Sequence, residues 1–106
     1  MKKYLIYRTT KGIDKEIKNH ELIGIEYGDD IYAATDAIMR AVSDDLSENP
    51  EYAGCEVTAC APEEVDPNLI RTKRYQYETT GLIMPPHASK GSHVDYGIVE
   101  QESTEE

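Results

Sequence analysis

The fold is decided by one stretch, DIYAATDAIMRAVSDDL, at residues 30–46. Its apolar residues recur at the spacing of a single helix face, and this pattern is typical of an amphipathic helix packed on a core. These apolar residues are Ile31, Ala34, Ile38, Ala41, Val42 and Leu46. Asp30 is suited to cap the first turn, and Pro50 disfavours the helical conformation at Asn49. We therefore predict one helix from about Asp30 to Leu46.

Five further segments have the residue types of β-strands. Residues 10–20 are polar and predict a loop or a wide hairpin connection. Short connections between neighbouring strands favour antiparallel pairing. The sequence thus predicts an α+β fold of two layers, a mainly antiparallel sheet of about five strands in the order β-β-α-β-β-β with one amphipathic helix on one face. The predicted strands are Lys3–Thr9, Leu22–Tyr27, Cys55–Ala61, Thr72–Met84 and His93–Glu100.

Side-chain alternation assigns residues to the two faces of this sheet. Ile23, Ile25 and Tyr27 are expected on one face, with Leu22 and Gly24 on the other. Tyr75 and Tyr77 are expected to share a face, and so are Cys55, Val57 and Ala59. A helix of about 17 residues is roughly 25 Å long. It covers only part of five strands, so the remaining face must be solvated, curled or covered by another molecule.

The chain has 106 residues, which is the size of one domain. We expect a single domain over residues 1–100 and a disordered acidic tail over 101–106, since the tail has three Glu and no apolar side chain. Apolar runs are too short for a membrane span or a signal peptide. The sequence therefore predicts a soluble cytoplasmic protein that does not bind membranes.

Charge is strongly negative, at -10, and unevenly distributed. Residues 1–20 hold six cations and two carboxylates, whereas residues 21–70 hold thirteen carboxylates and one cation, Arg40. This acidic middle opposes binding to a phosphate backbone, which depends on cations, and favours a partner with a basic face. An alternative is that its carboxylates, from Asp29 to Asp66, imitate the phosphate array of a nucleic acid.

Candidates for chemistry are few. His87, His93 and Asp95 surround a polar loop, and a hairpin that joined them would resemble an open metal or acid/base site. Cys55 is expected in the core and Cys60 as a free thiol, because five-residue spacing on a strand places them on opposite faces. No phosphate-binding loop, nucleophile elbow or metal-binding pair is present. We predict no cofactor and favour a non-enzymatic role, with an enzyme at His87, His93 and Asp95 as the alternative.

Tyrosine dominates the aromatic residues: the chain has eight Tyr and neither Phe nor Trp. Tyr suits contact surfaces, because it combines a large ring with a polar end. We predict a small acidic interaction module, an inhibitor or accessory protein, that forms a homodimer. A nucleic-acid-binding domain on the Tyr75 and Tyr77 strand, beside Arg71, Lys73 and Arg74, is a further alternative. The predicted binding residues are Tyr4, Tyr7, Tyr75, Tyr77 and Tyr96.

Overall fold

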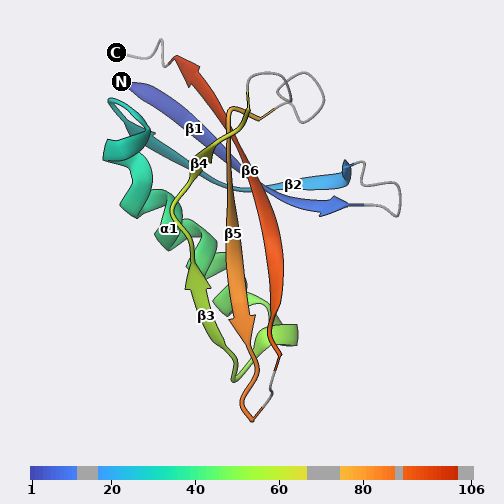
Figure 1. Ribbon diagram of the computed structural model, residues 1–106. Coiled ribbons are helices and arrows are strands. Elements are labelled where there is room, and N and C mark those ends of the chain that lie inside the picture. The colour runs from blue at the N-terminus through green and yellow to red at the C-terminus, as the bar shows by residue number, and fades with distance from the viewer. Residues whose placement is uncertain (12–16, 67–74, 88–89, 103–106) are drawn as a thin grey trace.

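One curled antiparallel sheet packs against one helix in the computed structural model (Figure 1). The structure describes residues 1–11, 17–66, 75–87 and 90–102. The sheet order is β2-β1-β6-β5-β3, and β4 also pairs with β5. The predicted α+β fold is confirmed. Its elements are β1 (Lys2–Lys11), β2 (Ile17–Gly28), α1 (Ile31–Glu48), the 3-10 helix η1 (Pro50–Tyr52), β3 (Glu56–Ala59), β4 (Glu63–Glu64), β5 (Tyr77–Met84) and β6 (Ser92–Glu102).

Helix α1 starts and packs as its sequence predicts. The Asp30 carboxylate accepts a hydrogen bond of 2.8 Å from the Ala33 N–H, which satisfies a donor that the first turn leaves free. Four residues of the predicted stripe are buried, and Ile31 and Ala41 pack against them. The core on this side of the sheet consists of Tyr4, Ile6, Ala34, Ile38, Val42, Leu46, Ile83, Tyr96 and Ile98.

Strand β2 approaches α1 closely at Gly28. A Cβ atom there would lie 3.0 Å from the Ala34 nitrogen, which is tighter than nearly all real Cβ contacts, whereas one at Gly24 would make an ordinary contact with Ala41 at 3.7 Å. The side of the sheet that holds this helix is called the covered face below. The opposite side is called the open face.

The predicted faces of β2 are wrong at Leu22 and Ile23. Pairing with β1 passes from Ile6–Gly24 to Tyr7–Leu22, so Ile23 is the extra residue of a β-bulge. Ile23 packs against the core instead of sharing a face with Ile25 and Tyr27, and Leu22 lies opposite Tyr7 on the open face. The predicted loop over residues 10–20 is also too long, because β2 begins at Ile17.

The prediction that Tyr75 and Tyr77 lie on the same face of the sheet is wrong as well. Strand β5 begins at Tyr77, and the chain bends at Gln76, whose N–H donates to the Ile98 carbonyl. The Tyr75 ring lies against Gly97, whereas the Tyr77 ring meets Tyr4 edge-on. The bend breaks the alternation and places the two rings on opposite faces.

The other elements agree with the sequence, apart from their ends and two additions, η1 and β4. Cys55, Val57 and Ala59 pack against the core together, as predicted. The short strand β4 lies between the predicted strands Cys55–Ala61 and Thr72–Met84, where no strand was predicted. Strand β6 continues to Glu102, so residues 101 and 102 of the predicted disordered tail belong to the sheet. The other residues of the predicted tail, 103–106, lie outside the described residues.

Candidate binding surface

Three neighbouring strands place apolar side chains side by side on the open face. Residues directly opposite each other in antiparallel strands share a face. Leu5 lies opposite both Ile25 and Val99, and Tyr7 lies opposite both Leu22 and Gly97. These two rows and Tyr27 form a contiguous surface across β2, β1 and β6. It is called the open-face patch and consists of Leu5, Tyr7, Leu22, Ile25, Tyr27 and Val99.

The open-face patch is exposed at the sheet edge and carries little charge. The side chains from β2 are 38–48% exposed, an unusual degree for large apolar residues that adjoin one another. Lys3 lies opposite Tyr27, and Glu78 lies opposite Gly97 on the same face, so each borders the patch. The six patch residues themselves are uncharged, within a molecule of net charge -10.

Tyr75 forms one border of the patch. Its ring is only 5% exposed and lies on the backbone of Gly97, where a Cβ atom would be 2.4 Å from the ring. The Tyr7 ring is 6.1 Å away, at a tilted angle. Glycine at position 97 is thus what allows Tyr75 to lie flat on the sheet beside Tyr7.

The five predicted binding tyrosines are divided between the two faces. Tyr4 and Tyr96 are 0% and 1% exposed in the core, and Tyr77 is half-buried against it. Tyr7 and Tyr75 lie on the open face. Sequence reasoning did not single out the aliphatic members of the patch; side-chain alternation along residues 3–9 is the signal that could have placed Leu5 beside Tyr7.

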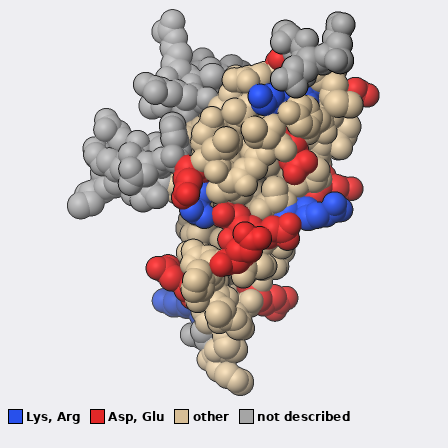
Figure 2. All heavy atoms as spheres, turned by 180° about the vertical axis from the view of Figure 1, so that it is seen from behind, with Lys and Arg blue, Asp and Glu red and all other residues tan. Residues whose placement is uncertain are grey.

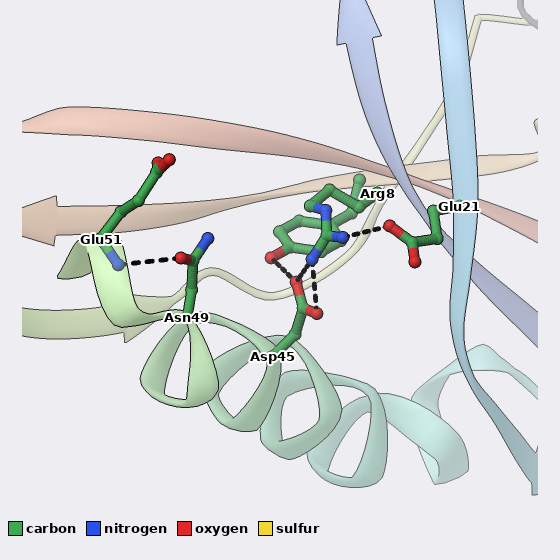
Figure 3. A network of polar contacts seen from close by, with 6 residues as sticks. Arg8, Glu21, Asp45, Asn49 and Glu51 are labelled. Atoms are coloured by element: carbon green, nitrogen blue, oxygen red, sulfur yellow. Dashed lines mark hydrogen bonds and ion pairs between the residues drawn. The ribbon is translucent and has the colours of Figure 1, made fainter. Parts of the chain in front are cut away.

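A polar network joins α1 to the sheet on the covered face (Figure 3). The Arg8 guanidinium donates through Nη1 to both carboxylate oxygens of Asp45, at 2.7 and 2.9 Å, and pairs through Nη2 with Glu21. The Tyr96 hydroxyl donates to Asp45 at 2.7 Å. Burial first, and then this hydrogen bond, raises the pKa of Tyr96. Because each charge in the network has a partner, the network fixes α1 in place and offers no reactive group.

A second polar cluster lies where β1, β6 and β5 meet near the start of α1. Lys2 pairs with Glu100 at 3.0 Å, and Tyr4 lies opposite Glu100 in the sheet. Burial, then the hydrogen bond and charge of Glu100, raise the pKa of Tyr77 to about 12. Among the described residues, the Tyr4 hydroxyl is the buried side-chain polar atom that lacks a hydrogen-bond partner. Phenols with raised pKa values stay neutral near pH 7 and are poor nucleophiles.

The residues of the alternative enzyme site are partly brought together. His93 Nε2 lies 4.0 Å from Asp95 Oδ1, and both residues lie on the open face of β6. His87 is exposed in a turn with a left-handed backbone, at φ 62°. Within residues 1–11, 17–66, 75–87 and 90–102, no three metal-ligating side chains are grouped, and Cys55 and Cys60 are both unbridged.

The alternative nucleic-acid surface is not assembled by its two tyrosines. Tyr75 and Tyr77 face opposite sides of the sheet, so they do not form one stacking platform. Arg71, Lys73 and Arg74 lie outside the described residues. Seen from the side opposite to Figure 1, acidic side chains gather around the middle of the molecule (Figure 2). Such a surface repels a phosphate backbone.

The fold and this surface define a small α+β protein with a helix on one face of its sheet and an apolar patch on the other. No family model, no curated protein and no solved structure matches the chain. In the part of the chain that the structure describes, no helix combines the length and apolarity needed to cross a membrane.

Proposed function

We propose that this protein is a non-enzymatic, cytoplasmic interaction module that forms a homodimer through its open-face patch. The observation that carries the proposal is the contiguous row of Ile25, Leu5 and Val99, which is apolar although the molecule is strongly acidic. Contiguous exposed apolar surface of this kind is typical of protein contacts. Tyr7 contributes the aromatic ring expected in such a contact.

A second copy of the chain is the occupant that the apolar character of the patch and the size of the molecule favour, against the repulsion of the two net charges. The six patch residues are uncharged, so two patches that meet about a two-fold axis bury no carboxylate of their own. The molecule measures 47 × 31 × 19 Å, so its broad sides exceed the roughly 800 Å² that each partner contributes to a standard interface. Two-fold dimers are also the commonest closed oligomers.

Sedimentation velocity at low and high salt tests the proposal. We expect a dimer at micromolar concentration that becomes tighter in high salt, because two subunits of charge -10 repel each other until ions screen them over about 10 Å at 0.1 M. A monomer at both salt concentrations, up to about 100 μM, would contradict the proposal, because a specific interface is tighter than this.

Two variants with the same change in charge locate the contact. Ile25→Asp places a carboxylate within the patch and should yield a monomer. Tyr32→Asp is the matched control, because Tyr32 is 85% exposed on α1 and lies away from the open face. If both variants weaken the dimer equally, the effect is due to net charge. If Ile25→Asp still forms the dimer, the open-face patch is not the dimer contact.

A further inference from the structure

Among the described strands, β2 ends the sheet, and one of its backbone edges has no neighbouring strand. In the described residues β2 pairs with β1, and the sheet order stops there. The opposite edge is formed by the short strands β3 and β4, with Pro62 between them, which are features that natural proteins use to protect an edge. Strand β2 has 12 residues. It offers N–H and C=O groups that a further strand could pair with.

The bulge at Ile23 limits the regular part of this edge to Gly24–Gly28. Over these residues the register with β1 is uninterrupted, from Ile6–Gly24 to Lys2–Gly28. Ile25 and Tyr27 face the open side and are 38% and 48% exposed. Glu26 faces the covered side, opposite Tyr4. On this face its neighbours along β2 are Gly24 and Gly28, which have no side chains to crowd it.

We propose that the edge Gly24–Gly28 binds an extended segment of another protein as an added antiparallel strand. Apolar residues of that segment lie opposite Ile25 and Tyr27, and a Lys or Arg lies opposite Glu26. Main-chain hydrogen bonds provide affinity in such strand addition, and alternate side chains provide specificity. Opposite charges directly across antiparallel strands stabilise the pair.

Charge complementarity selects this occupant. Residues 21–70, which include the whole edge, hold thirteen carboxylates and one cation, so a basic segment is attracted at long range. A second β2 centred on the same run would place Glu26 against Glu26, which is destabilising. The proposal uses the edge and does not depend on the homodimer.

A five-residue core, Thr-Val-Lys-Val-Thr, in a fluorescein-labelled peptide with serine at both ends, is the probe. Its Lys falls opposite Glu26 and its two Val opposite Ile25 and Tyr27. We expect binding by fluorescence anisotropy that weakens with salt, and slower amide hydrogen exchange over residues 24–28. The same peptide with Glu in place of Lys should bind at least about 10-fold more weakly, a difference of about 1.4 kcal/mol. Equal binding of the two peptides, or protection elsewhere in the chain, would overturn the proposal.

Charge-reversal variants separate the edge from general acidity. Glu26→Lys should reverse the preference between the two peptides, and Glu26→Gln, which keeps the shape, should abolish it. Glu56→Lys is the matched control, because Glu56 is an exposed carboxylate on β3 at the other edge of the sheet. It should change affinity less than about twofold, as expected for a distant screened charge. Equal effects of Glu26→Lys and Glu56→Lys would refute a site at β2.

Discussion

Alternate residues of β1 serve two different environments. Tyr4 and Ile6 face α1 and are 0% exposed, whereas Leu5 and Tyr7, between and beside them, face the other way and are half-buried. Both pairs are large and apolar, so hydrophobicity alone does not distinguish them. The difference is the helix, which covers one face and leaves the other. The covered face supplies stability, and the open face leaves apolar side chains partly exposed.

The largest difference between the faces should appear on truncating an isoleucine. Ile38→Ala removes a fully buried side chain and should reduce the free energy of unfolding by about 2–4 kcal/mol. Ile25→Ala, on the open face, should cost less than about 0.5 kcal/mol in the monomer, as is usual for surface positions. Urea denaturation at a concentration below that of association measures both values. Similar losses would mean that the faces are assigned incorrectly.

The two carboxylates bound by Arg8 give a smaller contrast. The Asp45 side chain is 15% exposed and bonds to both Arg8 and Tyr96, whereas that of Glu21 is 72% exposed. Asp45→Asn should therefore reduce stability by about 1–3 kcal/mol, because it leaves buried donors poorly satisfied. Glu21→Gln should cost no more than about 0.5 kcal/mol. Thermal unfolding followed by circular dichroism compares them; a larger loss for Glu21→Gln would reverse the assigned roles.

Alanine in place of glycine should show how tightly each face is packed at Gly81 and Gly97. A Cβ at Gly81 would lie 2.3 Å from Leu46 Cδ1 in the core, and overpacking of this kind costs about 1–3 kcal/mol. A Cβ at Gly97 would lie 2.4 Å from the Tyr75 ring, and Tyr75 is only 5% exposed although it lies on the open face. We therefore expect a comparable loss of stability for Gly97→Ala, with altered NMR signals of the Tyr75 and Tyr7 rings. Unchanged ring signals would show that Tyr75 does not rest on Gly97.

The smallest effect should be seen at alkaline pH. The pKa of Tyr77 is raised from 10.0 to about 12. Between these two pH values Tyr77 keeps its proton in the folded protein and loses it in the unfolded chain. Its contribution to stability is complete below pH 10 and is lost as pH rises to about 12. Tyr77→Phe should make the decline in this interval shallower than in the unmodified protein, as measured by urea denaturation at several pH values. Parallel declines would show that Tyr77 does not titrate late.

The sequence predicted the covered face better than the open one, for identifiable physical reasons. Helical periodicity correctly gave the buried stripe of α1, because that pattern is local. The faces of Leu22 and Ile23 depend on a bulge, which is set by pairing with β1 and has no clear signature in β2 itself. The position of Tyr75 depends on the bend at Gln76, which the Ile98 carbonyl stabilises from a distant strand. Two residues, Glu63 and Glu64, are too few to show a strand pattern.

The candidate surface was anticipated only in outline. One helix cannot cover five strands, so the numbers of predicted helices and strands already indicated that part of the sheet is left uncovered by the helix. Its members did not follow, because Leu5, Ile25 and Val99 become neighbours only through the register of three strands. Tyrosine content indicated contact residues, yet Tyr4 and Tyr96 are used in the core.

The central strand pair also determines how this chain can fold. Strands β1 and β6 lie side by side in the middle of the sheet, and Lys2 reaches Glu100 across 98 positions of sequence. Contacts between such distant segments require closure of a long loop and slow the folding of small proteins. During synthesis the hairpin of β1 and β2, and then α1, leave the ribosome well before β6 exists. The sheet is completed only when its last strand inserts between β1 and β5, so a nascent chain ending before residue 92 should remain incompletely folded.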